Sequence, residues 1–252
     1  MRLDQWLVKL ELISTRSKAQ QLIKSGAVQV YYQKVWKKVL KPGFELEELN
    51  VETIRIEDTS VLKYVSRAGL KLDGAIDKVG LQISGKTAID LGTSTGGFVD
   101  CLIQGGIQRV VGIDVGTAQL AESLRNHDKF HLFENTNARD YSHELILGSN
   151  LDQKFDLLVC DLSFISLDKV LSHSVPLIKD GGEFLCLVKP QFELTPSDLN
   201  RKGLVKDVKK LDEVREKVTQ LFHSCKLSVK DYFESSIEGT DGNKEFFIYA
   251  IK

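Results

Sequence analysis

The sequence predicts an α/β protein, with a parallel sheet flanked by helices and a small basic domain in front of it. Three observations lead to this fold class. Short apolar runs alternate with helical patterns from residue 64 onward, and this alternation is typical of right-handed β-α-β crossovers. A glycine-rich turn follows the first of these runs. The first 41 residues carry nine Lys and Arg against two acids, a charge of +7, so the rest of this chain of net charge −1 carries −8.

Composition places the chain among ordinary globular proteins. Its 252 residues are 42% hydrophobic and 27% charged, enough for one or two well-packed domains. No apolar run approaches the roughly 18 residues of a membrane span, and Asp4 and Glu11 interrupt the N-terminal stretch, unlike in a secretory signal. The four cysteines contain no C-x-x-C pair, which argues against zinc or redox chemistry. We therefore expect reduced thiols, no metal site and a cytoplasmic protein.

The basic segment predicts two helices followed by a strand. Apolar residues recur at helical spacing over residues 2–12. Thr15 is placed to cap a second helix, and Gly26 is placed to end it. Residues 27–31 then alternate apolar and polar side chains, as a half-buried strand does.

A change in composition marks the expected domain boundary. Residues 45–58 are acidic and are expected to hold one or two short strands and a linker. We place the boundary near residue 60, which gives a small α/β domain over residues 1–60 and a larger domain over residues 61–252.

The first domain resembles the S4-type RNA-binding domain in the stretch LDQWLVKLELISTRSKAQQLIKSGAVQV. The resemblance implies that basic side chains face structured RNA, which proteins recognise mainly by shape and by phosphate and 2′-hydroxyl contacts. The residues expected to contact RNA are Arg2, Arg16, Lys18, Lys24, Lys34 and Arg67. One departure concerns the turn after the strand, where the family usually has Asn-Gly and this chain has Tyr31-Tyr32-Gln33-Lys34.

The sequence of the second domain predicts five strands that alternate with helices, followed by a final pair of strands. A helix capped by Ser66 and ended by Gly80 comes first. The strands are then expected in TAIDLG, RVVGIDV, HLFEN, FDLLVCDL and EFLCLVKP, with a helix to about Ile178 after the fourth and another over residues 207–225. The last two β-like runs, LSVKDYFES and EFFIYAI, are close enough to form an antiparallel hairpin at one sheet edge.

The turn after the first of these strands is a candidate nucleotide-cofactor site. The segment Asp90-Leu91-Gly92-Thr93-Ser94-Thr95-Gly96-Gly97 ends a strand and opens a helix, and Asp114 ends the next strand. Asp114 is placed to accept hydrogen bonds from ribose hydroxyls. Both NAD(P) and S-adenosylmethionine fit this pattern, but a carboxylate at position 90 would repel a pyrophosphate and suits an aminoacyl sulfonium. An ordinary strand-to-helix turn with an incidental Asp is the alternative.

The residues expected to bind this cofactor come from three strand ends. They are Asp90, Gly92, Ser94, Gly96 and Gly97 at the amino-acid end, Asp114 and Val115 at the ribose and adenine, and Asn137 and Ala138 near the adenine edge.

Four further residues are candidates for catalysis. Asp161 and Lys189 follow apolar strands, so both should emerge at the carboxyl edge, where open α/β sheets bind ligands. Lys71 lies on the predicted first helix of the second domain, and Glu245 precedes the last strand. Each has an ordinary explanation as a solvated, capping or paired side chain, and only the combination points to chemistry.

The combination resembles the FtsJ-like ribose 2′-O-methyltransferases, whose active site is a Lys-Asp-Lys-Glu tetrad in this chain order. With the first domain included, the whole sequence resembles the TlyA (hemolysin A) family, through stretches such as YVSRAGLKLDGAI, DLGTSTGGFVDCLIQGG, DLLVCDLSFISL and LVKPQFEL. The resemblance implies a Rossmann-like class I S-adenosylmethionine-dependent fold. It also implies methyl transfer to ribose 2′-hydroxyls of ribosomal RNA, classically at cytidine, with ribosomal RNA or subunits as partners.

We expect one of the two lysines to act as the general base and assign this role to Lys189. Mutual repulsion and partial desolvation would keep one lysine neutral part of the time. Lys71 would hold the hydroxyl, Asp161 would orient Lys189, and Glu245 would fix Lys71.

Three other functions remain open from the sequence. They are a non-catalytic RNA- or ribosome-binding factor, a membrane-active hemolysin, and an NAD-dependent oxidoreductase. The sequence shows no strongly amphipathic basic helix of the membrane type, and no set of hydride-transfer residues. The oligomeric state is left open.

Overall fold

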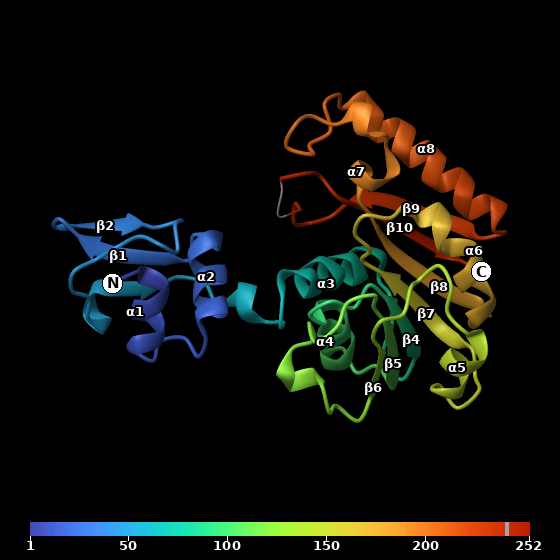
Figure 1. Ribbon diagram of the computed structural model, residues 1–252, viewed down its shortest axis with the longest axis horizontal. Coiled ribbons are helices and arrows are strands. Elements are labelled where there is room, and N and C mark those ends of the chain that lie inside the picture. The colour runs from blue at the N-terminus through green and yellow to red at the C-terminus, as the bar shows by residue number, and fades with distance from the viewer. Residues whose placement is uncertain (240–241) are drawn as a thin grey trace. The chain divides into compact units, whose positions relative to one another are not determined.

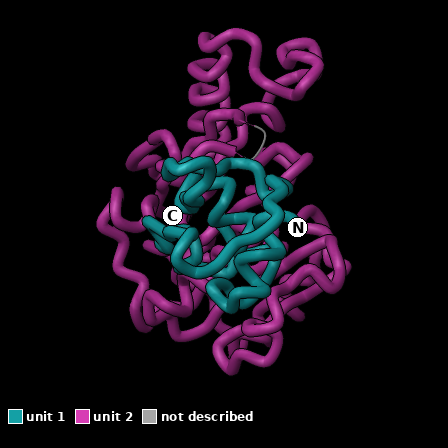
Figure 2. Tube along the Cα trace, turned by 90° about the vertical axis from the view of Figure 1, so that its left-hand side faces the viewer, with its two compact units in different colours: residues 1–67 teal, residues 68–252 magenta. Residues whose placement is uncertain are grey.

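The computed structural model describes residues 1–239 and 242–252. The chain divides into two compact units, Met1–Arg67 and Ala68–Lys252 (Figure 2). Residues 61–67, assigned from the sequence to the second domain, thus fall in the first unit. One contact that holds them there runs from the Gln21 side-chain amide, which donates to the Val61 carbonyl at 2.8 Å.

The first unit packs two helices on one face of a three-stranded antiparallel sheet. Helix α1 spans Leu3–Lys9 and helix α2 spans Arg16–Ser25. The sheet order is β2-β1-β3, with β1 at Val28–Tyr32, β2 at Val35–Lys38 and β3 at Ile54–Ile56. The predicted helix limits hold at α2: the Thr15 hydroxyl accepts from the Lys18 amide at 3.3 Å, and Gly26 ends the helix in the left-handed conformation.

The turn between β1 and β2 keeps a tight hairpin without Asn-Gly. Gln33 and Lys34 both have positive φ, at 52° and 65°, as the two central residues of a type I′ turn do. Tyr32 pairs with Val35 across the two-residue loop. The chain therefore forms a type I′ turn although Gln33 and Lys34 stand where the family usually has Asn-Gly.

The second unit contains a seven-stranded sheet in the order β6-β5-β4-β7-β8-β10-β9 (Figure 1). The strands are β4 Thr87–Leu91, β5 Arg109–Ile113, β6 Phe130–Phe133, β7 Phe155–Cys160, β8 Ile178–Val188, β9 Ser228–Glu234 and β10 Phe246–Ile251. The first five are parallel, and β10 and β9 run antiparallel at one edge, as the sequence predicts. The fold class expected from the sequence is confirmed.

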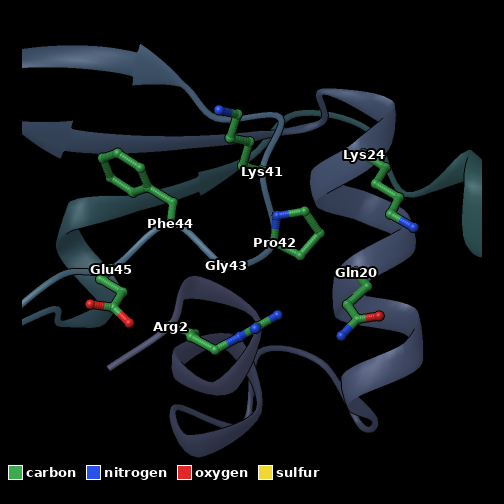
Figure 3. A pocket seen from close by; sticks show the side chains of 8 residues that line it. All are labelled: Arg2, Gln20, Lys24, Lys41, Pro42, Gly43, Phe44 and Glu45. Carbon is green, nitrogen blue, oxygen red and sulfur yellow. The ribbon is translucent and has the colours of Figure 1, made fainter.

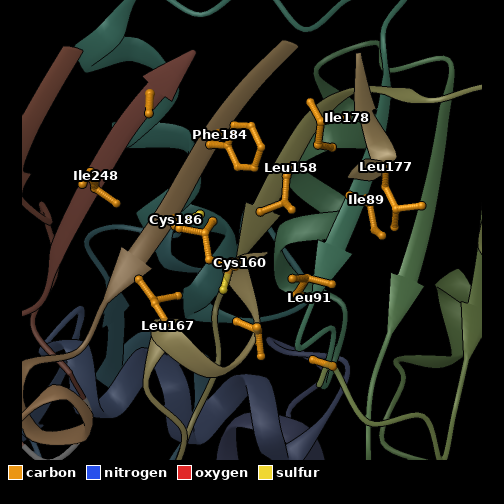
Figure 4. Close-up of a cluster of buried hydrophobic side chains, with 14 of the residues drawn as sticks. Ile89, Leu91, Leu158, Cys160, Leu167, Leu177, Ile178, Phe184, Cys186 and Ile248 are labelled. Carbon is orange, nitrogen blue, oxygen red and sulfur yellow. The ribbon is translucent and has the colours of Figure 1, made fainter. Parts of the chain in front are cut away.

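Helices cover both faces of this sheet (Figure 1). They are α3 Arg67–Val79, α4 Gly97–Gln104, α5 His143–Gly148, α6 Leu171–Ser174, α7 Pro190–Glu193 and α8 Lys209–Ser224. The largest buried apolar cluster lies on the face covered by α5, α6 and α8, with Leu158 and Phe184 from neighbouring strands at its centre (Figure 4). On the opposite face the rings of Phe98 in α4 and Phe247 in β10 stack with centroids 6.3 Å apart.

Two local predictions were wrong. Among residues 1–239 and 242–252 the buried Ser66 hydroxyl has no hydrogen-bond partner, so it does not cap α3 as expected. The helix expected between β7 and β8 is broken into short 3-10 turns around α6, because Pro176 cannot supply a backbone amide to a continuous helix. Among the residues described, no helix is long and apolar enough to cross a membrane.

Candidate active site

The glycine turn after β4 packs directly on the end of β7. Gly92 has φ +87°, and a Cβ built there would lie 2.6 Å from the Asp161 carbonyl oxygen. Gly96 has φ +89°, and its Cβ would lie 2.4 Å from Leu124 Cδ1. Only glycine meets both the conformation and the space at these two positions, so the turn brings the backbone of β4 against the residue that follows β7.

A cavity of about 450 Å³ opens at this edge of the sheet. Six of the residues predicted to bind the cofactor line it: Gly92, Ser94, Asp114, Val115, Asn137 and Ala138. Asp90, Gly96 and Gly97 do not line it. Asp90 is buried within β4, and the two glycines shape the turn and begin α4. A ligand in this cavity would therefore not touch Asp90, Gly96 or Gly97 directly, contrary to expectation.

Asp114 is held in place by backbone amides. One carboxylate oxygen accepts from the Ser94 amide and the other from the Gly116 amide, both at 2.6 Å. Each oxygen keeps a further lone pair. The carboxylate is thus oriented at the cavity wall, where the two hydroxyls of a ribose would be suitable donors.

Asp90 is a fully buried carboxylate without a visible counter-charge. Its exposure is 0%, and neither carboxylate oxygen has a hydrogen-bond partner among the described residues. Burial raises the pKa of Asp90 to about 7, and the nearby Asp161 and Asp114 carboxylates add to the effect. A buried acid of this kind fits a ligand with a positive charge, such as the ammonium or sulfonium of S-adenosylmethionine, better than a pyrophosphate.

The four candidate catalytic residues form two ion pairs. Lys71 Nζ lies 2.5 Å from Glu245 Oε2, and Lys189 Nζ lies 2.5 Å from Asp161 Oδ1. All four side chains are at most 15% exposed. The structure therefore pairs each lysine with a carboxylate from a distant part of the chain.

Strand pairing brings the two ion pairs to one edge. Val188 of β8 lies opposite Phe246 of β10, so Lys189 and Glu245 follow and precede directly paired residues. Cys160 of β7 lies opposite Cys186 of β8, which sets Asp161 at the same end of the sheet. From the sequence we expect the two lysines to repel each other. In the structure each ammonium instead faces a carboxylate.

Residues of the loop after Asp161 were missed by the sequence reasoning. The Ser163 hydroxyl accepts from Lys189 Nζ at 3.0 Å. Phe164 lines the cavity, is 88% exposed and has φ +63°, a conformation rarely adopted by a bulky residue. Its ring lies 5.0 Å from that of Phe192. The only sequence signal was the position of this loop at the carboxyl edge, where binding residues concentrate.

The predicted RNA-binding residues belong to the first unit, and two of them meet at one buried acid. Asp4 is 0% exposed and accepts from Arg2 at 3.0 Å, from Arg16 at 3.0 Å and from Gln20 at 2.6 Å. Burial alone would raise the pKa of Asp4, but donation from Arg2, Gln20 and Arg16 outweighs it and holds that pKa far below its usual range.

A cavity of about 670 Å³ lies beside Arg2. Figure 3 shows Arg2 reaching towards Gln20 of α2, with Lys24 and Lys41 at the rim. Of the other predicted RNA-binding residues, Lys18 and Lys34 are exposed. Arg67, at the start of α3, is half-buried.

Comparison with known proteins identifies both parts of the chain. The sequence profile of the FtsJ-like methyltransferases matches residues 64–252. The chain belongs to the FtsJ-like methyltransferase family. The S4 domain profile matches residues 1–35. Membership in this family makes the chain an enzyme of the methyltransferase type, and S-adenosylmethionine is the implied methyl donor.

Full-length relatives place the chain in the TlyA (hemolysin A) group of this family. It is 34% identical to hemolysin A of Brachyspira hyodysenteriae and 35% identical to the 23S rRNA (cytidine-2′-O)-methyltransferase TlyA of Campylobacter jejuni, in each case over 100% of both chains. A solved structure from Streptococcus thermophilus, named as a hemolysin, superimposes with a TM-score of 0.75 at 33% identity. That match covers 100% of this chain and 88% of the other.

Proposed function

We propose that this protein methylates ribose 2′-hydroxyls of ribosomal RNA, at cytidine, with S-adenosylmethionine as methyl donor. The observation that supports this most directly is the pairing of Lys189 with Asp161 beside a cavity that Asp114 and Asp161 line. The name of the Campylobacter relative describes this same reaction. Ribosomal RNA as substrate also places the protein in the cytoplasm.

S-adenosylmethionine supplies an electrophilic methyl group on a sulfonium. The residues that would hold it are Asp114 at the ribose hydroxyls and Val115 and Ala138 at the adenine, while Asp90, buried before the glycine turn, would add negative charge without lining the cavity. In the transfer, the 2′-oxygen forms a bond to the methyl carbon as the sulfur–methyl bond breaks, and the hydroxyl proton leaves. Asp114 therefore orients the donor while other side chains handle the proton.

Lys189 is the proposed acceptor of that proton. It must first lose its own ammonium proton, after which its nitrogen can take up the 2′-hydroxyl proton. Asp161 and Ser163 hold Nζ at 2.5 and 3.0 Å and so fix its direction. Asp161 also stabilises the ammonium that forms when the proton arrives.

Lys71 is the proposed partner of the reacting oxygen. An ammonium near the 2′-oxygen stabilises the negative charge that develops as the proton leaves. Glu245 fixes that ammonium through the 2.5 Å ion pair. The exposed ring of Phe164 at the cavity offers a surface for the base attached to the reacting ribose.

The test is methyl transfer to ribosomal subunits purified from cells that lack this protein. Labelled S-adenosylmethionine should place methyl groups on RNA, and mapping should locate them at ribose 2′-oxygens of cytidine. A matched reaction with Lys189→Ala should show no incorporation. Binding to subunits without any transfer would instead indicate a non-catalytic RNA-binding factor and reject the proposal. Leakage of liposomes without transfer would indicate a membrane-active protein.

A further inference from the structure

The sheet of the first unit has an outer face that the two helices do not cover. In β1, Val28 and Val30 are buried, while Gln29 is half-buried and Tyr31 is 44% exposed. Directly paired residues on neighbouring strands point to the same side. Tyr31 pairs with Trp36 of β2, and Gln29 pairs with Arg55 of β3. The outer face therefore presents Tyr31, Trp36 and Arg55 together, and we call these three residues the aromatic face.

The side chains of the aromatic face are in contact with one another. The Tyr31 and Trp36 ring centroids lie 5.4 Å apart at an interplanar angle of 53°. The Arg55 guanidinium lies over the Trp36 ring, 3.9 Å from its centroid. Tyr31 is exposed and Trp36 is half-buried, so part of each ring reaches the surface. The two rings and the Arg55 guanidinium hold one another in place across the three strands.

Charge on the hairpin indicates the class of ligand. Residues 27–44 contain four lysines and no acid. Lys38 on β2 is exposed and pairs with Gln29, so it lies on the side of the aromatic face, whereas the neighbouring Lys37 pairs with Val30 and lies on the other side. One acid does contact this part of the sheet, because Glu57 accepts a hydrogen bond from the Gln29 side chain at 2.5 Å. Aromatic rings combined with lysine and arginine suit a polyanion that carries stackable bases.

We propose that the aromatic face binds an unpaired nucleotide of RNA, with the base stacked on Tyr31 and Trp36 and the adjoining phosphates near Lys38 and Arg55. The proposal rests on the proposed RNA substrate. It adds a site separate from the arginines that Asp4 holds. Open sheet faces with two aromatic side chains are a recurrent way of reading single-stranded RNA, because every base has a flat face to stack.

The experiment uses the full chain and a fluorescent oligoadenylate of about eight nucleotides. The comparison ligand is the same oligomer with abasic riboses, which keeps the phosphates and removes the bases. The chain has two tryptophans, and the other, Trp6, is buried with its indole N–H bonded to the Leu46 carbonyl at 3.2 Å. Quenching of tryptophan fluorescence by the base-bearing oligomer alone would therefore report stacking on Trp36.

Variants separate stacking from charge. Trp36→Leu should weaken binding of the base-bearing oligomer about fivefold or more and leave the abasic oligomer unaffected. Trp36→Phe, which keeps a ring, should restore most of the affinity. Lys38→Gln should weaken both oligomers and reduce the salt dependence of binding by about one counterion. Val51→Ser removes an exposed apolar side chain elsewhere in the same unit and should change neither.

Two results would overturn the inference. One is equal affinity for the base-bearing and abasic oligomers, and the other is wild-type binding by a folded Trp36→Leu variant. Methyl transfer to ribosomal subunits, measured in parallel, distinguishes this outcome from failure of the proposed function. Methyl transfer without base-dependent binding would reject only the proposed nucleotide site on the aromatic face. Base-dependent binding without methyl transfer would reject only the proposed methylation activity.

Discussion

Lys189 Nζ lies 2.5 Å from Asp161 Oδ1, although the two residues end different strands of the sheet. The pair is only 11% and 15% exposed, and Asp161 also lines the cavity assigned to the methyl donor. The side chain proposed as the proton acceptor is thus held by a carboxylate that lines the cavity proposed for the methyl donor.

Replacing Lys189 with Ala should abolish methyl transfer while the affinity for S-adenosylmethionine stays within about twofold. Loss of a positioned acid-base group costs about 10²–10⁴ in rate. Transfer to ribosomal subunits and calorimetric binding of the donor measure the two effects separately. Lys154→Ala removes an exposed lysine and serves as the control. Turnover retained by Lys189→Ala would reject the assignment of the base.

Removing Glu245 should destabilise the protein as well as inactivate it. Glu245→Ala takes away the carboxylate that faces the buried Lys71 ammonium, which should lower the free energy of unfolding by about 3 kcal/mol. The double variant Lys71→Met with Glu245→Leu replaces the ion pair by apolar side chains and should recover most of that loss. Urea unfolding measures both. Methyl transfer should remain absent in the stable double variant, and its recovery would show that the pair is only structural.

Donor binding should release a proton near neutral pH. The pKa of Asp90 is about 7 because the group is buried, and a cationic ligand favours the ionised form. The affinity for S-adenosylmethionine should therefore rise between about pH 6 and pH 8. Calorimetry in two buffers of different ionisation enthalpy detects the released proton. Asp90→Asn should remove both the pH dependence and the proton release, and a variant that kept them would contradict this role.

The same group has a separate effect on folding. Its folded pKa lies above the ordinary value of 3.8, so the folded state binds more protons than the unfolded state between about pH 4 and pH 7. The contribution of Asp90 to stability is then fully present below pH 4 and is lost as the pH rises towards 7. Unfolding of wild type and Asp90→Asn across this range should converge at the acid end.

Asp4→Asn should weaken RNA binding even though it makes the protein more positive. Asp4 accepts hydrogen bonds of 3.0 Å from Arg2 and Arg16. Without this carboxylate the two guanidinium groups are no longer held in a fixed orientation towards RNA. Filter binding of ribosomal subunits measures the effect. Glu48→Gln makes the same change in charge at an exposed site and should strengthen binding slightly. Tighter binding by Asp4→Asn would show that charge outweighs positioning.

Asp4→Asn should also change the acid stability of the first unit. The pKa of Asp4 is lowered in the folded state, so its stabilising contribution is present above the unfolded value and is lost as the pH falls through the folded one. The variant should be less stable than wild type at pH 7, by about 1 kcal/mol because hydrogen bonds to the carboxylate are weakened, and the difference should shrink on acidification. Urea unfolding at several pH values gives the comparison.

The parts of the fold that could be predicted from the sequence are those set by local chemistry. Thr15 and Gly26 define α2 because capping and a left-handed stop act within one turn of chain. Strands β7 and β8 contain the apolar runs at residues 157–160 and 184–188, because parallel strands are covered on both faces. The carboxyl-edge placement of Asp161 and Lys189 follows from the same pattern.

What could not be predicted depends on contacts between distant residues. The segment after Asp161 is held by Glu193, which accepts from the Leu167 amide at 2.8 Å and from the Ser166 hydroxyl at 2.5 Å. No local pattern indicates this tie, so a regular helix was the natural expectation there. The pairing of each tetrad lysine with one carboxylate likewise depends on strand register rather than on residue spacing.

Gly92 has a consequence for how the active site can move. Its missing side chain lets the turn after β4 rest against the Asp161 carbonyl oxygen, and the Asp161 amide in turn donates to the Leu91 carbonyl at 3.0 Å. The turn proposed to hold the donor and the carboxylate proposed to orient the base are thereby joined by direct backbone contacts. Any displacement of one is transmitted to the other, so donor loading and alignment of the base are expected to be set in the same event.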